Sequence, residues 1–565
     1  MRNWAFSAAV SALLTMGACS KPPSDFAQAT EDFVYSSLAL SPVSATQAGY
    51  HLHQGVALDR ELDDYSPQAM ERQRSFYLGF RSRLAGFPAD ALTGEERADL
   101  RIMEDQISLA LLELDTIQNY RHNPTQYVEL VGNALFSPYM LNYAPKERRF
   151  RDIVARLQKV PALMEQAKEN LMDAPEAWNR VAREENEGNI ALIDATLRQA
   201  APNEMRSDYA AAAAPALAAL RGFSDFLATT LAAKTSDWRL GKEKYAEKFR
   251  YVLATGKTPE ETLGDAEKQL KITREELDKL AAPKTAREAL DAIAREHTTS
   301  ETYFDEAKKD LERARQFVEA RGLVPLPSGE QLEVIPTPEF VRGIYGVGGF
   351  NPAPALEPQL GAYYWITPIP KDWPRDRVES KLREYNRYGL EHLTIHEAMP
   401  GHWVQFEYAN RIEPVGRRLL RALFGNGPYV EGWAVYTQQM MTDEGYLDGD
   451  PGLRLTYLKQ MLRVLTNTIL DVRLQTMGMS DREALDLMTI DAFQEREEAV
   501  AKLQRAQLSS CQLPMYFVGW SGWRRVLGDE RKRMGADFNL ARFHEEALKE
   551  GAVPLPVLDE LLKGK

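Results

Sequence analysis

Apolar residues recur at intervals of three and four positions through most of this chain, which is the spacing that places them on one face of an α-helix. Long amphipathic stretches fill residues 26–320, including 147–168, 209–231 and 259–280, and proline and glycine residues separate them. No unit of fixed length repeats. A chain of 565 residues with 44% hydrophobic content is long enough to bury a large core. The sequence therefore predicts a mainly α fold.

Residues 321–374 interrupt the helical pattern. They are rich in proline and glycine and contain two β-prone runs, LEVIPTPEF and GAYYWITPIP. We predict a small β-sheet in this connection, between a helical lobe of residues 26–320 and a second helical lobe of residues 375–565, with a deep cleft between the lobes. The glycine-rich YGVGGF, residues 345–350, lacks the lysine and serine of a phosphate-binding loop, so we predict a turn there. No flexible linker is visible, which favours one continuous unit with subdomains.

The segment HLTIHEAMPGHWVQ concentrates metal-binding chemistry in the second predicted lobe. His396 and His402 are candidate zinc ligands and Glu397 is a candidate general base, as in the zinc-peptidase pattern H-E-x-x-H with two residues added. In an unbroken helix, residues six positions apart lie about 9 Å apart along the axis and about 120° apart around it, so the two histidines could not share an ion. Pro400 and Gly401 favour a looped-out turn that returns His402 to the place of an i+4 ligand.

Two alternatives to this ligand pair remain open. His396 continues a buried apolar stripe that begins at Val378, and a hydrogen-bonded core histidine would occupy the same position. His392 and His396 are also an i, i+4 pair and form a rival ligand set. That set leaves Glu397 and the Pro-Gly break without a role.

A catalytic zinc site has three protein ligands and one open position, so a third ligand must come from elsewhere in the chain. The segment PYVEGWAVYTQQMM, opened by Gly427 and Pro428, is predicted to form a second helix. Its Glu431 is the candidate third ligand. A glutamate near a helix start is also explained by the helix dipole alone.

Three blocks in this order, HEAMPGHWVQ, EGWAVY and QLPMYFVG, resemble the bacterial family called domain of unknown function 885. The resemblance covers most of the chain and includes weaker segments at residues 237–256, 361–368 and 470–480. Members of this family resemble zinc-dependent peptidases of the gluzincin type, which implies a zincin-like arrangement with a small sheet beside the helix that carries the metal ligands.

The resemblance also implies roles for individual residues. His396, His402 and Glu431 would bind Zn²⁺, Glu397 would act as the base, and Tyr516 would donate a hydrogen bond to the oxyanion. Without the resemblance, a tyrosine flanked by apolar residues is equally explained as a core aromatic.

Two positions depart from the pattern of the family. Gln438 stands where many members have glutamate, and Gln475 stands where histidine is common. Both lie outside the predicted ligand set. A neutral amide can orient a neighbouring group but cannot supply charge, so we expect these positions to affect the support of the site and the choice of substrate.

The predicted strand at residues 363–367 is expected to lie beside the helix that carries the histidines. An exposed strand edge can bind an extended peptide through backbone hydrogen bonds, so Tyr363 and Tyr364 are candidate substrate-binding residues. Gln405, three residues after His402, completes this candidate set. The alternative is an ordinary interior strand that covers the helix.

Residues 1–18 have the pattern of a bacterial lipoprotein signal peptide. Arg2 precedes a short apolar run, and Met-Gly-Ala-Cys places small residues before Cys19, the predicted lipidation site. The run is too short for a membrane span, and a core helix is the alternative. Residues 19–25 would form a lipidated tether. Ser20 stands where an Asp retention signal would lie, so resemblance to other lipoproteins implies the periplasmic face of the outer membrane in a Gram-negative bacterium.

Cysteine usage and net charge argue against a disulfide-stabilised fold, a cysteine nucleophile and a nucleic-acid partner. With Cys19 acylated, Cys511 has no disulfide partner, and we interpret it as a small buried residue rather than a nucleophile. Removal of residues 1–18 eliminates one positive charge and changes the formal net charge from −13 to −14. An acidic chain without a basic stretch repels nucleic acid, so no nucleic-acid partner is expected. Contact with a membrane is expected through the lipid anchor only.

Together these features predict a zinc-dependent hydrolase that cleaves peptide bonds, with short peptides as the substrates if the cleft is narrow and deep. One alternative is a zinc- or peptide-binding lipoprotein without catalysis, and another is a metal hydrolase of a non-peptide amide or ester. Endopeptidase, carboxypeptidase and dipeptidase differ in what blocks each end of the cleft, and the motifs do not separate them.

Overall fold

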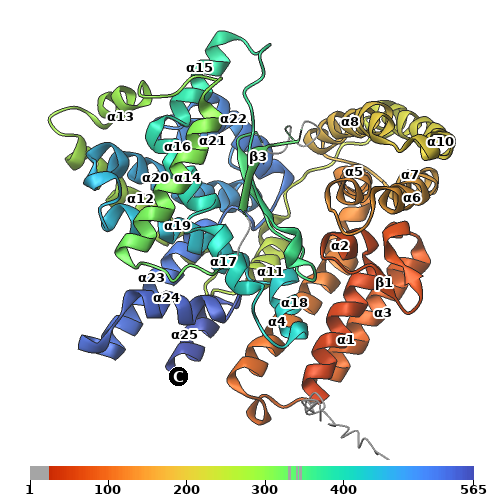
Figure 1. The fold of residues 1–565 in the computed structure, drawn as a ribbon, viewed down its shortest axis with the longest axis horizontal. Coiled ribbons are helices and arrows are strands. Elements are labelled where there is room, and N and C mark those ends of the chain that lie inside the picture. Colours follow the sequence, from red (N-terminus) through yellow and green to blue (C-terminus); the bar gives the residue numbers. More distant parts are fainter. Residues whose placement is uncertain (1–24, 329–331, 339–341, 343–345, 565) are drawn as a thin grey trace, which may run out of the picture.

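The computed structural model describes residues 25–328, 332–338, 342 and 346–564. Most of these residues are helical and the strands are short, so the predicted mainly α fold is confirmed (Figure 1). The first half contains α1 (Asp25–Leu40), α2 (Pro42–Gln47), β1 (Leu52–His53), β2 (Val56–Ala57), α3 (Pro67–Leu84), α4 (Gly94–Leu112), α5 (Thr125–Met140), α6 (Lys146–Leu157), α7 (Val160–Asn170), α8 (Glu176–Ala191), α9 (Arg198–Ala200), α10 (Arg206–Phe226), α11 (Gly241–Leu253) and α12 (Pro259–Ala281). The second half contains α13 (Ala286–Ala294), α14 (Tyr303–Arg321), β3 (Leu332–Pro336), β4 (Gly348–Asn351), β5 (Ala362–Ile366), α15 (Arg375–Glu384), α16 (Arg387–Glu397), α17 (His402–Ala409), α18 (Val415–Leu423), α19 (Gly427–Asp443), α20 (Pro451–Thr476), α21 (Asp481–Asp486), α22 (Arg496–Leu508), α23 (Met515–Met534), α24 (Leu540–Lys549) and α25 (Leu555–Lys563). No helix in this described part of the chain is both long enough and apolar enough to cross a membrane.

The hydrophobic cores do not follow the two predicted lobes. Helices α5 to α10 enclose a core of their own, and α5, α6, α7, α8 and α10 form the group at the upper right of Figure 1. Helices α11 to α13 instead pack their apolar faces on α20. Helices α1 and α4 pack on α18, where the ring centroids of Phe33 and Phe424 lie 5.5 Å apart and Asp99 accepts a 2.8 Å hydrogen bond from Arg421. Helices from both sides of the boundary predicted at residue 320 therefore contribute side chains to the same hydrophobic cores, because their apolar faces pack against one another.

A three-stranded sheet with the order β3-β5-β4 forms in the predicted connection. Strand β3 is parallel to β5 and β4 is antiparallel to it. The prediction that residues 363–367 form an exposed edge is wrong, because β5 is the central strand and pairs on both sides. The alternative of an interior strand is the one observed. Tyr364 is fully buried, and its hydroxyl shares a 3.1 Å hydrogen bond with Thr394 Oγ1 on α16.

The glycine-rich run contributes the outer strand β4, so the turn predicted at residues 345–350 is wrong for its described part. At Gly348, φ is +146° and a Cβ would lie 2.2 Å from the carbonyl oxygen of Trp365 in β5. The glycine is needed because two backbones approach closely at this point. A strand pattern based on β-branched and aromatic residues does not detect such a segment.

The helix that carries His396 is shorter than predicted. The apolar stripe from Val378 is divided between α15 and α16, because Asn386 starts a new helix. Its side chain accepts hydrogen bonds from the backbone N–H groups of Tyr388 and Gly389, at 3.0 and 3.2 Å. Helix α16 therefore has only 11 residues.

Helices α19 and α23 approach until their backbones touch. A Cβ at Gly432 would lie 2.4 Å from the Gly519 Cα, and a Cβ at Gly519 would lie 2.0 Å from the Pro428 carbonyl oxygen. Helices separated by side chains keep their axes about 8–10 Å apart, so paired glycines permit a closer approach. The contact brings Glu431 on α19 within electrostatic range of Tyr516 on α23.

We expect Gly519→Ala to lower the free energy of unfolding by about 3 kcal/mol, because the new methyl group meets rigid backbone on α19. Gly528→Ala on the same helix is the matched control, since a Cβ there has nothing within 4 Å. Alanine at position 528 should stabilise the helix by about 0.5–1 kcal/mol. Urea denaturation measures both variants, and equal unfolding free energies would contradict the backbone contact.

Candidate metal centre

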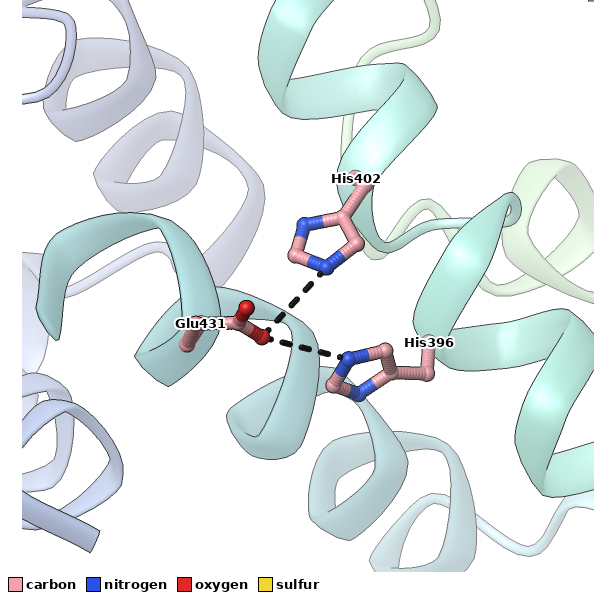
Figure 2. Close-up of side chains that lie close together, drawn as sticks. All are labelled: His396, His402 and Glu431. Atoms are coloured by element: carbon pink, nitrogen blue, oxygen red, sulfur yellow. Dashed lines mark ion pairs between the residues drawn. The ribbon is translucent and has the colours of Figure 1, made fainter. Parts of the chain in front are cut away.

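Three side chains from three helices point toward one another (Figure 2). His396 lies in the last turn of α16, His402 is the first residue of α17, and Glu431 lies in α19. The Nε2 atoms of His396 and His402 lie 3.4 and 3.6 Å from Oε2 of Glu431. The two imidazole centroids are 4.8 Å apart. The structure thus brings the three predicted ligand residues together, with ligand atoms mutually within 4.8 Å.

The Pro-Gly sequence achieves this by ending a helix, and not by a loop extruded within one. Helix α16 ends at Glu397, the chain turns through residues 398–401, and α17 begins at His402. A Cβ at Gly401 would lie 2.0 Å from the His396 carbonyl oxygen. The turn therefore requires glycine where it folds back on the end of α16.

Trp433 of α19 holds this turn in place. Its fully buried indole N–H donates to the carbonyl oxygens of Pro400, at 2.9 Å, and Gly401, at 3.1 Å. Buried carbonyl groups in a helix break need such partners, because the helical hydrogen bonds are lost there. Glu431 lies two residues before Trp433, so the helix that supplies the third candidate ligand also fixes the turn between the other two.

The geometry and chemistry of this triad fit a Zn²⁺ ion. Two imidazole nitrogens and one carboxylate oxygen form a ligand set of catalytic zinc sites, in which bonds of about 2.0–2.2 Å separate tetrahedral ligands by about 3.3 Å. The observed separations of 3.4 and 3.6 Å are close to this value. Within the described residues, Glu431 Oε2 is buried and accepts no hydrogen bond. A cation would stabilise this carboxylate oxygen.

The ionisation of the triad follows from its packing. Burial would raise the pKa of the Glu431 carboxyl, but the imidazoles of His396 and His402 outweigh burial and hold it well below its usual range. Burial opposes protonation of His402, and the adjacent Glu431 outweighs that effect, so the pKa of His402 is raised. The carboxylate therefore remains ionised.

Glu397 is bound to the outer strand of the sheet. Its Oε2 accepts a 2.9 Å hydrogen bond from the backbone N–H of Phe350 in β4. The Phe350 ring lies 6.4 Å from the His402 ring between centroids, with an angle of 28° between the ring planes. Strand β4 thus contacts both the candidate base and a candidate ligand. Phe350 was not predicted as a site residue, and the glycine-rich run before it was the available signal.

Tyr516, the second residue of α23, lies beside the triad. Its ring stacks on His396 with 6.3 Å between centroids, and its hydroxyl oxygen accepts a 3.2 Å hydrogen bond from Arg505 Nη2. Burial and the charge of Glu431 raise the pKa of Tyr516 to about 12. Because Arg505 acts as the donor, the hydroxyl hydrogen of Tyr516 is available to another acceptor. Arg505 was not predicted as a site residue, because it lies outside the motifs.

Other candidate residues have different environments. His392, the rival ligand, is buried against α20, where its Nε2 contacts the Leu453 carbonyl oxygen at 3.1 Å and burial lowers its pKa to about 4. Gln405 is only 1% exposed, so the structure does not present it to a substrate. Cys511 is a buried free cysteine, as interpreted. Cys19 lies outside the described residues.

The two glutamines that depart from the family pattern form hydrogen bonds between segments that are far apart in the sequence. Gln438 Nε2 donates a 2.9 Å hydrogen bond to the His392 carbonyl oxygen, which joins α19 to α16. Gln475 accepts from the Leu240 N–H at 2.9 Å and donates to the Ser509 carbonyl at 3.1 Å. An ionised glutamate at position 438 could not make the donation to His392, so in this chain the Gln438 amide supports the helices that carry the triad.

We expect the triad to bind Zn²⁺, and we expect Gly401→Ala to weaken that binding by about 10- to 100-fold, because the added methyl group displaces the turn that positions His402. Competition with a fluorescent chelator measures the affinity, and circular dichroism establishes that the variant is folded. Gly528→Ala is the control and should bind zinc as the wild type does. Unchanged affinity in Gly401→Ala would show that the turn tolerates a side chain.

Two solved structures share this fold. A candidate lipoprotein of unknown function from Shewanella oneidensis is 28% identical, with a TM-score of 0.80 over 96% of this chain and 100% of that chain. A candidate lipoprotein from Colwellia psychrerythraea is 19% identical, with a TM-score of 0.78 over 96% of this chain and 99% of that chain. At this identity, the second likeness shows the fold alone.

Curated proteins give no significant match to the chain. A bacterial family of unknown function, DUF885, matches residues 42–562. The match includes the turn between α16 and α17, the helix that carries Glu431 and the segment around Tyr516. Because it extends over nearly the whole sequence, the chain belongs to the DUF885 family.

Proposed function

We propose that this protein is a zinc-dependent hydrolase that cleaves peptide bonds in short peptides. The observation that carries the proposal is the convergence of His396, His402 and Glu431 next to a carboxylate, Glu397, that is not part of the triad. A site that only stores or captures a metal needs ligands and no general base. The presence of Glu397 therefore favours catalysis over binding alone.

When bound to the triad, Zn²⁺ lowers the pKa of water and polarises a carbonyl group. Glu397 accepts the proton of the attacking water and passes it to the leaving amine nitrogen. The N–H of Phe350 fixes Oε2 of this carboxylate, which leaves Oε1 to receive the proton. Tyr516 donates its hydroxyl hydrogen to the developing oxyanion, and Arg505 holds that hydroxyl in place.

Strand β4 supports a peptide as the substrate. It is an outer strand of the sheet, and its Phe350 N–H points toward Glu397 rather than toward β5. An extended peptide can add to such an edge through backbone hydrogen bonds. This edge takes the place of the one first expected at residues 363–367, and it favours a peptide over a non-peptide amide.

We also propose that Cys19 carries a lipid anchor that holds the protein at the periplasmic face of the outer membrane. The small residues before Cys19 support lipidation. The similar structure from Shewanella oneidensis is described as a candidate lipoprotein, which agrees with this proposal. The catalytic part would then work in the periplasm.

We expect Glu397→Gln to bind zinc as the wild type does and to cleave a mixed library of short peptides about 10²- to 10⁴-fold more slowly, because the amide cannot accept a proton. Glu431→Gln should lose zinc, since a neutral amide replaces a charged ligand. Elemental analysis and mass spectrometry of the products measure both effects. Full activity in Glu397→Gln would exclude it as the base, and stoichiometric zinc in Glu431→Gln would exclude it as a ligand.

For the anchor, we expect Cys19→Ala to move the protein from the outer-membrane fraction to the soluble fraction, because one acylated cysteine is the sole attachment proposed. Mass spectrometry of the N-terminal peptide should show the lipid in the wild type. An unmodified Cys19 in the wild type would refute the anchor.

A further inference from the structure

Helix α22 carries a charged face next to the candidate metal centre. Glu498, Lys502 and Arg505 follow one another at positions i, i+4 and i+7, which lie on one side of a helix. Arg505 donates to the Tyr516 hydroxyl at 3.2 Å. Glu431 of the triad interacts electrostatically with both Lys502 and Arg505. This face of α22 therefore adjoins the site.

Lys502 is a buried amine that forms no ion pair with any described residue. It is 6% exposed, and within the described part of the chain no hydrogen bond or ion pair engages its Nζ. Burial, together with the positive charges of Arg463 and Arg505, holds the pKa of Lys502 well below its usual range. An anion placed beside this amine would favour its charged form.

The carboxylates of Glu498 and Glu384 already accept hydrogen bonds from other side chains. Glu498 Oε2 accepts hydrogen bonds from Arg463 at 3.2 Å and from Tyr385 at 3.3 Å. Glu384 accepts a 2.7 Å hydrogen bond from Lys459. Among the described residues, Lys502 and Arg505 therefore form no ion pair with a carboxylate, in a chain whose formal net charge is −13.

We propose that Lys502 and Arg505 bind the C-terminal carboxylate of the peptide, so that the protein acts as a carboxypeptidase. This inference rests on the proposed function and names the substrate class of the same site. The backbone in the middle of a longer peptide is neutral, so it would leave the buried Lys502 amine without an anionic partner. A terminal carboxylate supplies the missing charge and positions the last peptide bonds relative to Glu397.

The test compares one N-acetylated pentapeptide with a free C-terminus and the same peptide with a C-terminal amide, both with the zinc-loaded mature protein. We expect kcat/KM to be about 10- to 100-fold higher for the free acid, which is the effect of one charge-assisted hydrogen bond to a carboxylate. Mass spectrometry should locate the cleaved bond close to the C-terminus.

A variant links this preference to the lysine. Lys502→Met keeps the length of the side chain and removes its charge, so it should fold with an unchanged or higher Tm and should lose most of the preference for the free acid. Lys532→Met is the matched control, because Lys532 is 84% exposed on α23. It should keep the wild-type preference.

Binding to zinc-loaded Glu397→Gln, measured by calorimetry, gives a second readout that needs no turnover. The free acid should bind more tightly than the amide by a similar factor. Equal cleavage and equal binding of the two peptides would overturn the carboxylate site and leave the proposed hydrolase intact. Cleavage of neither peptide by the wild type would overturn the proposed function and this inference together.

Discussion

The hydrogen bonds from the Trp433 indole to the carbonyl oxygens of Pro400 and Gly401 hold the candidate metal centre together. Without them, the break between α16 and α17 would bury the Pro400 carbonyl group without a partner among the described residues, at a cost of about 1–3 kcal/mol. The Gly401 carbonyl oxygen also accepts a 3.2 Å hydrogen bond from the Gln405 N–H. The indole is itself fixed, since its ring packs 5.0 Å from Trp523 and 5.3 Å from His544 between centroids. The separation of the two histidines therefore depends on the aromatic core that joins α19, α23 and α24.

Further contacts fix the other elements of the site from outside. Gln438 ties α19 to α16 through the His392 carbonyl, and Tyr364 ties the central strand to α16 through Thr394. Strand β4 reaches Glu397 only because β5 positions it at the outside of the sheet. The triad thus lies on rigid elements that contact one another directly, which is the condition for keeping ligand atoms within tenths of an ångström.

Much of this arrangement could be predicted from the sequence, because the chemistry is concentrated in short motifs. His396, Glu397 and His402 lie within seven residues, and a proline followed by glycine indicates a local break in a helix. Helical periodicity predicted the fold class and the helix that carries Glu431. Resemblance to the DUF885 family supplied Tyr516, whose ring the structure places on His396.

Other features depend on long-range packing, which a sequence pattern does not encode. In the sheet, β4 is an outer strand and β5, which was expected to form an edge, is the central strand. The apolar periodicity predicted one continuous helix, but the side chain of Asn386 caps a new helix, α16. Lys502 has no motif around it. The significance of its position depends on the packing of α22, which places it beside the candidate metal centre without an ion pair among the described residues.

The contact between Gly432 and Gly519 has a consequence for how this site can vary among related sequences. Neither residue has a functional group, yet any side chain at either position would push α19 and α23 apart. Because Glu431 lies on α19 and Tyr516 on α23, one such substitution would change the distance between them. The distance between these two helices therefore limits which residues either position can accept.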